Sequence, residues 1–160
     1  MTGVNVETNH GNISFDLLPD LAPETVRNFV KLTKDGFYDG TLFHRVIPGF
    51  MIQGGDPNTK NPNMKGQWGM GGPGHNVKAE FSSRSHLRGI VSMARSTDPD
   101  SAGSQFFIVT KDSTFLDREY TVFGEVTEGM DVTDKIVSLD RDGNDCPLED
   151  AKMLKVTISE

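Results

Sequence analysis

Short apolar stretches separated by turn residues dominate the hydrophobic pattern of this chain and predict mainly β-structure. The first stretch, "VNVETNHGNISFDL", alternates on both sides of a His-Gly pair and predicts an opening β-hairpin. Most of the later runs are bounded by Gly, Pro, Asp or Ser. They predict further strands at residues 41–46, 50–53, 89–94, 105–110, 121–126 and 153–158.

Two stretches have the periodicity of a helix instead. In "APETVRNFVKLTKDG" the apolar positions at helical spacing are Val26, Phe29 and Val30. Pro23 suits the first turn of this helix, and Gly36 suits the position just past its end. In "GMDVTDKIVS" the inward positions are Val132, Ile136 and Val137. Eight strands against two helices predict an antiparallel β-fold, and closure into a barrel would remove its exposed edges.

Composition bounds the classes of protein that remain. A chain of 160 residues predicts one domain, residues 1–160, and its 17 glycines with 35% hydrophobic residues are ordinary for a globular protein. The net charge of −7 argues against non-specific nucleic-acid binding, because Lys60, Lys65 and Lys78 are scattered. We expect no membrane partner, because nowhere do about 18 apolar residues follow one another.

The sequence also suggests a compartment. The single cysteine, Cys146, cannot form an internal disulfide and fits a reducing environment. We expect it to be a partly exposed thiol in a loop. The first residues, "MTGVNVETNHGN", have neither the charged nor the apolar region of a signal peptide. These features predict a cytoplasmic protein.

Several motifs match known sites only in part. "GMGGPG" fits the dinucleotide pattern G-x-G-x-x-G, but Pro73 interrupts it and no helical periodicity follows. It belongs to a Gly-, Pro- and Asn-rich stretch, residues 56–75, that predicts a long loop, either functional or disordered. "DRDGNDCPLED" places Gly143 at position 4, whereas a calcium loop needs glycine at position 6, so an acidic turn is favoured. The four histidines show no zinc-site spacing, and Ser104 lacks a nucleophile elbow.

The segment "FHRVIPGFMIQGGDP", residues 43–57, combines one arginine with apolar side chains and contains no serine or cysteine. His44 and Arg45 are adjacent in a predicted strand, so their side chains point to opposite faces. We expect His44 to be a hydrogen-bonded structural histidine and Arg45 to be the functional residue. The alternative for Arg45 is a surface salt bridge. The alternative for the aromatic and methionine side chains is core packing, which applies to Phe50, Met51, Phe106 and Phe107.

Taken together, these motifs carry a resemblance. "FHRVIPGFMIQGGDP", "GIVSMAR", "GSQFFIVT", "FLD" and "VFGEV" occur in this order and resemble the cyclophilin family of peptidyl-prolyl cis/trans isomerases. The resemblance covers essentially the whole chain. It implies a closed eight-stranded antiparallel β-barrel capped by two α-helices, and isomerisation of X–Pro bonds in unfolded or flexible protein segments. It also implies proline-containing peptides as partners, with no cofactor and no metal.

The resemblance further implies roles for individual residues. Arg45 would be the catalytic cation and Gln53 its hydrogen-bonding companion. Residues lining the proline site would be Phe50, Met51, Phe107 and Leu116. Residues along the peptide groove would be Ala94, Arg95 and Gln105, with Met70 as gatekeeper to a neighbouring side-chain pocket.

Three positions differ from many eukaryotic members of the family. Phe115 stands where they carry tryptophan, Tyr120 where they carry histidine, and Arg95 where they carry asparagine. Phe115 and Tyr120 still belong to the implied substrate groove. These residues resemble bacterial and archaeal members, and they predict weakened binding of cyclosporin. We expect the protein to be a monomer.

Two other functions stay open at this point. One is a module that binds proline peptides, or a chaperone, with little turnover. Arg45 discriminates between such a binding module and an isomerase, because a pure binder needs no cation at the prolyl nitrogen. The other is a small hydrolase, for which the sequence offers no pair of nucleophile and base.

Overall fold

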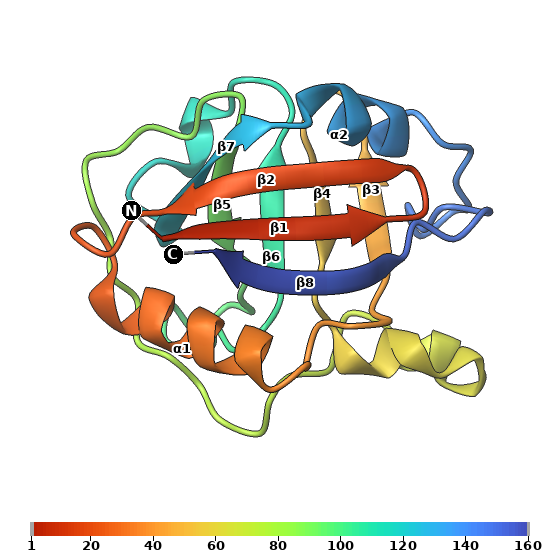
Figure 1. Cartoon of the computed structure of the whole chain (residues 1–160), viewed down its shortest axis with the longest axis horizontal. Helices are drawn as coiled ribbons and strands as arrows, with labels where there is room; N and C mark the ends of the chain where they lie inside the picture. Colours follow the sequence, from red (N-terminus) through yellow and green to blue (C-terminus); the bar gives the residue numbers. More distant parts are fainter. Residues whose placement is uncertain (1, 160) are drawn as a thin grey trace.

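The computed structural model describes residues 2–159 and contains one antiparallel sheet of eight strands (Figure 1). The strands are β1 (Gly3–Thr8), β2 (Gly11–Leu17), β3 (Phe43–Ile47), β4 (Met51–Gly54), β5 (Ile90–Met93), β6 (Phe106–Val109), β7 (Val122–Glu128) and β8 (Met153–Ser159). Their order in the sheet is β3-β4-β6-β5-β7-β2-β1-β8. The mainly β fold predicted from the apolar stretches is confirmed.

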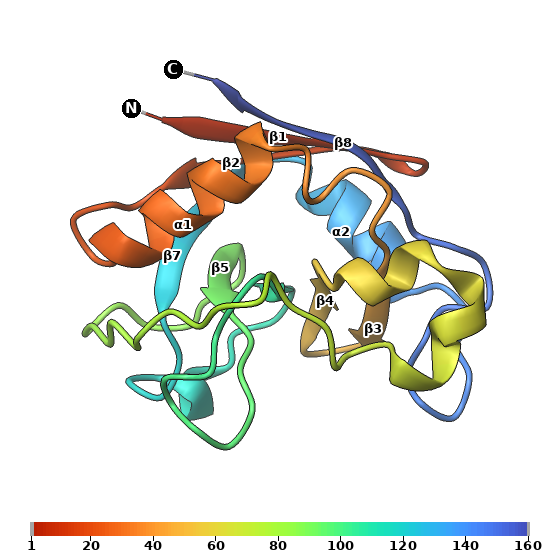
Figure 2. The same cartoon turned by 90° about the horizontal axis from the view of Figure 1, so that it is seen from below.

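The sheet curls until its two edges approach one another. Strands β1, β2 and β8 form a layer that crosses the layer of β3, β4, β5 and β6 (Figures 1 and 2). The edge strands β3 and β8 are joined only near their starts, by an isolated bridge between Leu42 and Lys152. Beside it, the Phe43 amide donates to the Ala151 carbonyl at 2.8 Å. The predicted closed barrel therefore overstates the closure, because β8 pairs along its length with β1, whereas its pairing with the β3 edge is limited to the residues around this bridge.

Two helices cover opposite ends of the curled sheet (Figure 1). They are α1 (Pro23–Lys34) and α2 (Met130–Val137), close to the predicted ranges. Gly36 follows α1 with a φ of +75°, which a residue with a Cβ rarely adopts, so its predicted place after the helix is confirmed. Phe29 of α1 packs edge-on against Phe106, with ring centroids 5.6 Å apart. Phe106 is thus a core residue.

The predicted long loop is ordered for much of its length. It contains two short 3₁₀-helices, η1 (Pro57–Lys60) and η2 (Pro62–Gln67), and a third, η3 (Thr114–Leu116), occurs later in the chain. Each of the first two begins at the proline of an Asx-Pro pair. The side chain of Asp56 accepts from the Asn58 amide at 2.8 Å, and that of Asn61 accepts from the Asn63 amide at 3.0 Å. This repeated capping by Asp or Asn replaces the structureless loop that composition predicted.

The acidic turn near the C-terminus also buries the cysteine. The Asp142 carboxylate accepts from the amides of Asn144 (2.8 Å) and Cys146 (3.1 Å), so it closes a turn. Cys146 is only 7% exposed, and the prediction of a partly exposed thiol is wrong. The turn directs the cysteine side chain into the interior.

None of the helices within residues 2–159 has the length and apolarity needed to cross a membrane.

Candidate active site

Arg45 and Gln53 face each other across two neighbouring strands. They form a register pair between β3 and β4, and Arg45 Nη1 donates to Gln53 Oε1 at 3.3 Å. Strand alternation buries His44 and exposes Arg45, as predicted. Within residues 2–159 no carboxylate forms an ion pair with Arg45. A salt bridge therefore does not account for this arginine.

An apolar pocket of about 110 Å³ opens beside this pair. It is lined by Arg45, Phe50, Met51, Gln53, Ala94, Arg95, Phe107, Leu116 and Tyr120. All nine were singled out from the sequence, and the fold brings them together from β3, β4, β6, η3 and the connecting loops. Met51, Phe107 and Leu116 are less than 10% exposed, so the pocket has a rigid apolar wall. The alternative of plain core packing applies only to the side of these residues that faces away from the pocket.

A second arginine borders the pocket but is differently bonded. The guanidinium of Arg95 donates from Nε (3.0 Å) and Nη2 (2.7 Å) to the Glu119 carbonyl, and from Nη1 to the Ser96 carbonyl at 3.0 Å. It also lies over the Tyr120 ring, 4.6 Å from the centroid. These contacts occupy the donors of Arg95 and hold the segment around Tyr120. Arg45, by contrast, donates to one neutral amide, and its other donors have no partner within residues 2–159.

A chain of amide side chains continues from Gln53. Its Nε2 donates to Gln105 Oε1 at 3.0 Å, and Gln105 Nε2 donates to the carbonyls of Gly69 (2.9 Å) and Gly71 (3.0 Å). Met70 lies between these glycines with 79% of its surface exposed. A larger hollow of about 730 Å³ follows, and Gln53, Met70 and Gln105 are among its lining residues. The structure thus places Met70, the implied gatekeeper, on the exposed lining of this larger hollow.

Two aromatic positions that differ from many family members lie at the pocket, Tyr120 in its lining and Phe115 beside it. Phe115 lies outside the lining, 69% exposed, and its ring packs on Phe50 with centroids 5.5 Å apart. Tyr120 meets Phe107 edge-on, with centroids 5.7 Å apart and planes at 86°. Of the twelve site residues that the resemblance implies, nine line the apolar pocket. The other three, Met70, Gln105 and Phe115, lie around it.

Sequence reasoning missed a polar cluster behind the pocket. The fully buried ring of His86 stacks on Phe107, with planes 17° apart and centroids at 6.1 Å. Its Nδ1 lies 3.1 Å from Asp117 Oδ1, and its Nε2 lies 3.0 Å from Ser92 Oγ. Burial lowers the pKa of His86 and outweighs the opposing effect of Asp117. His86 and Asp117 are 31 positions apart, and no local motif announces their pairing.

This Ser-His-Asp arrangement does not revive the hydrolase alternative. Ser92 is fully buried, and its hydroxyl lies 2.9 Å from the Thr121 carbonyl, which it can reach as a donor. A substrate carbonyl could not approach it without breaking the strand. The cluster instead supports Phe107 from behind.

The environment of His44 differs in part from expectation. Its side chain is buried, and burial lowers its pKa. Nδ1, however, has no hydrogen-bond partner in the described part of the chain. The ring is buried, as expected, and a hydrogen bond with the Leu42 backbone opposes part of the effect of burial on its pKa, so the hydrogen-bonded role holds at most for the other ring nitrogen. Among residues 2–159, no group of three or more His, Cys, Asp or Glu side chains is arranged to hold a metal ion.

Comparison with known proteins places this site in a family. Residues 3–158 match the family described as "Cyclophilin type peptidyl-prolyl cis-trans isomerase/CLD". A probable peptidyl-prolyl cis-trans isomerase of Brucella suis is 44% identical over 159 residues, covering 97% of this chain and 81% of the relative. Peptidyl-prolyl cis-trans isomerase B of Escherichia coli is 42% identical over 172 residues, covering 98% of this chain and 99% of the relative.

A solved structure agrees with these relatives. The cyclophilin type peptidyl-prolyl cis-trans isomerase of Cryptosporidium parvum, crystallised in the presence of the dipeptide Ala-Pro, has a TM-score of 0.90 and 32% identity. The alignment covers 99% of both chains. The chain belongs to the cyclophilin family of peptidyl-prolyl cis-trans isomerases.

Proposed function

We propose that Arg45 is the catalytic residue of this isomerase and that the apolar pocket holds the proline ring of the substrate. The X–Pro bond resists rotation because the nitrogen lone pair is delocalised into the carbonyl, with a barrier of ~18–20 kcal/mol. A barrier of this size gives an uncatalysed rate of about 10⁻² per second. Rotation breaks no covalent bond, so the site needs no nucleophile.

The guanidinium can act on the transition state alone. When the bond twists, the prolyl nitrogen becomes pyramidal and regains a lone pair that the planar ground state does not offer. A donor beside that nitrogen stabilises the twisted state selectively, which is the requirement for catalysis. Arginine keeps its charge throughout the physiological range, so the donor is always present.

The free donors of Arg45 are the observation that carries this proposal. Its one hydrogen bond within the described residues goes to the neutral Gln53, and no carboxylate neutralises its charge. Arg95, the other cation at the pocket, already donates to backbone carbonyls through three nitrogens. Of the two, Arg45 is the cation able to donate to a substrate. Gln53 accepts from it and so holds the guanidinium at the edge of the pocket.

The remaining features suit a flexible protein substrate. The groove around the pocket is open, and exposed Met70 and Phe115 offer apolar surface to residues that flank the proline. We further propose that the clients are unfolded or flexible segments and that the protein acts as a monomer, because one chain supplies every residue of the pocket. A cytoplasmic location is proposed from the single cysteine, which permits no internal disulfide.

Replacing Arg45 tests the mechanism. Arg45→Ala should lower kcat/KM for an Ala-Pro peptide by about a hundredfold or more, since removal of a preorganised donor to a transition state has effects of that order. Two-dimensional NMR exchange with catalytic amounts of protein measures the rate, and circular dichroism checks the fold. Arg27→Ala is the matched control, because Arg27 is exposed on α1 and, within residues 2–159, forms an ion pair only with Glu24.

The same experiment separates the isomerase mechanism from a binding module. If folded Arg45→Ala still exchanges the peptide at the rate of the unaltered protein, Arg45 is not catalytic. If the unaltered protein binds the peptide without accelerating exchange, binding alone is its function.

A further inference from the structure

We propose that Asp56 is a positioning residue for the isomerase reaction and fixes the orientation of Arg45 through a chain of hydrogen bonds. This inference rests on the catalytic role proposed for Arg45. Asp56 lies two residues after the end of β4 and does not line the apolar pocket. It is fully buried and forms no ion pair within residues 2–159, so its carboxylate is held by backbone amides.

The two oxygens of Asp56 have different partners. Oδ1 accepts from the Asn58 amide at 2.8 Å and caps η1. Oδ2 accepts from the amides of Gly69 and Gly71, the second at 3.2 Å. The carboxylate thus connects the start of η1 to the glycines on both sides of Met70.

Capping alone does not require a carboxylate here. Asn61 caps η2 in the same way, with its side chain accepting from the Asn63 amide at 3.0 Å. Burying a carboxylate costs several kcal/mol more than burying an amide unless its oxygens are well bonded. An amide side chain offers one acceptor oxygen, whereas the carboxylate accepts at both. The charge at position 56 is therefore explained by its second oxygen, which holds the amides of residues 69–71.

The glycines are held from both sides. Their amides donate to Asp56, while their carbonyls accept both hydrogens of the Gln105 amide. Contact with Asp56 is so close at Gly71 that an added Cβ would lie 2.1 Å from Oδ1. Only glycine permits this approach.

The contacts that Asp56 and Gln105 make with the two glycines form a clamp. This clamp sets the direction of every hydrogen bond that leads to Arg45. Backbone carbonyls only accept, so the NH₂ group of Gln105 must face Gly69 and Gly71 and its oxygen must face Gln53. The NH₂ group of Gln53 then donates to Gln105, which leaves its oxygen facing the guanidinium. If the glycine carbonyls moved, both amides could rotate by 180° and present NH₂ to Arg45. A donor facing a cation would turn the guanidinium away from the prolyl nitrogen.

The test is a double-mutant cycle on the full-length protein. Asp56→Asn keeps the shape and the cap on η1 but puts NH₂ where two amide donors point. We expect kcat for an Ala-Pro peptide to fall about tenfold with KM within twofold, since small misplacements of a catalytic group have effects of this order. In the Arg45→Ala background the same change should have no further effect on the residual rate. Asn61→Ala is the matched control and should leave kcat unchanged.

NMR of the Arg45 side chain adds a readout that a merely structural role would not move. Its Nε–Hε signal should shift or broaden in Asp56→Asn and stay in place in Asn61→Ala. A tenfold loss that persists in the Arg45→Ala background, or no loss in the single variant, would overturn the role of Asp56. If Arg45→Ala alone leaves kcat unchanged, the failure lies in the catalytic role proposed for Arg45 and not in the role of Asp56. If Asp56→Asn does not fold, Gly71→Ala releases the same clamp from its other side and carries the same cycle.

Discussion

The nine side chains around the apolar pocket come from distant parts of the chain, yet all except Tyr120 belong to motifs that are visible in the sequence. Motifs of this kind are local, so residue type and spacing reveal them. His86 lies in no such motif, and although Asp56 lies in one, the motif does not reveal which groups its carboxylate contacts. His86 contacts Asp117, 31 positions away, and Asp56 contacts Gly69, 13 positions away, and only the folded chain brings these groups together. Local pattern therefore singled out groups that line the pocket, and it missed the buried contacts around them.

Phe115 gives a prediction at this scale for cyclosporin. Its exposed ring packs on Phe50 and has no polar donor, whereas the tryptophan of many eukaryotic family members has an indole N–H. Phe115→Trp should tighten cyclosporin binding by roughly 0.5–1.5 kcal/mol, the usual net value of one hydrogen bond. Isothermal titration calorimetry measures the change.

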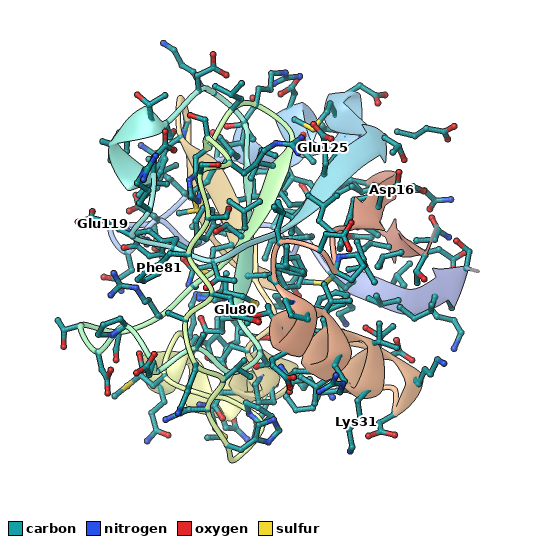
Figure 3. The ribbon with its side chains drawn as sticks, turned by 90° about the vertical axis from the view of Figure 1, so that its left-hand side faces the viewer. Asp16, Lys31, Glu80, Phe81, Glu119 and Glu125 are labelled. Carbon is teal, nitrogen blue, oxygen red and sulfur yellow. The ribbon has the colours of Figure 1, made fainter. Side chains whose placement is uncertain are left out.

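Phe81→Trp is the matched control, because Phe81 is also exposed (Figure 3) and lines none of the hollows beside Arg45. Equal tightening in both variants would mean that added aromatic surface, and not the donor at position 115, is responsible. Already tight binding in the unaltered protein would show that tryptophan at this position is unnecessary.

Among the elements, strands and helices were predictable to within about two residues, because their apolar positions repeat with a clear period. The 3₁₀-helices were not, because they are short and depend on Asx-Pro capping rather than on periodicity. The start of α1 shows a further limit. Its N-cap residue, Ala22, offers no side-chain acceptor. The acceptor comes instead from Glu80, 55 positions from Thr25, which no local pattern predicts.

Glu80 gives a prediction at the scale of the helix. Its carboxylate lies at the first turn of α1 (Figure 3) and accepts from the amides of Glu24 (3.2 Å) and Thr25 (2.7 Å). Replacing a cap of this kind typically costs ~0.5–2 kcal/mol. Glu80→Ala should lower the free energy of unfolding by about 1 kcal/mol, and Glu80→Gln by less, since one acceptor oxygen remains. Urea denaturation followed by circular dichroism measures both.

Glu149→Ala is the comparison for charge, because Glu149 is exposed in a loop and removes one carboxylate without touching a helix end. A loss of stability in Glu149→Ala equal to that in Glu80→Ala would assign the effect to net charge. Unchanged stability in Glu80→Ala would show that water replaces the cap at no cost.

At the scale of the whole molecule, the fold brings ionisable groups into environments that couple stability to pH. Burial lowers the pKa of both His44 and His86 below 6.5. Bonding to Arg88 lowers the pKa of Asp134 below 3.8, and the amides of Asn144 and Cys146 do the same for Asp142. These groups lie in β3, the loop before β5, α2 and the turn after it, and they share no hydrogen-bond partner among the described residues, so their effects on the free energy of unfolding should be close to additive.

The signs of these shifts predict a decline in two stages. Below pH 6.5 both histidines bind protons in the unfolded chain, whereas in the folded protein they stay neutral to a lower pH. The free energy of unfolding therefore falls as the pH falls. Below 3.8 the carboxylates lose their bonding advantage as the pH passes through their folded pKa values, and a second decline follows. Above pH 6.5 the contributions of all four groups are complete, which predicts a plateau.

Urea denaturation at intervals from pH 8 to pH 3 measures this profile. His86→Gln should reduce the first stage, because it removes one of the two histidines that the folded protein keeps neutral. It also removes the bond to Asp117, so the free energy of unfolding on the plateau should be lower as well. His75→Gln is the control, since His75 is exposed and its ring contacts the Asn28 side chain at the surface, so the first stage should persist. A free energy of unfolding that stays constant or rises between pH 6.5 and pH 5 would contradict the burial of two neutral histidines. A first stage that survives in His86→Gln at full size would assign it to His44 alone.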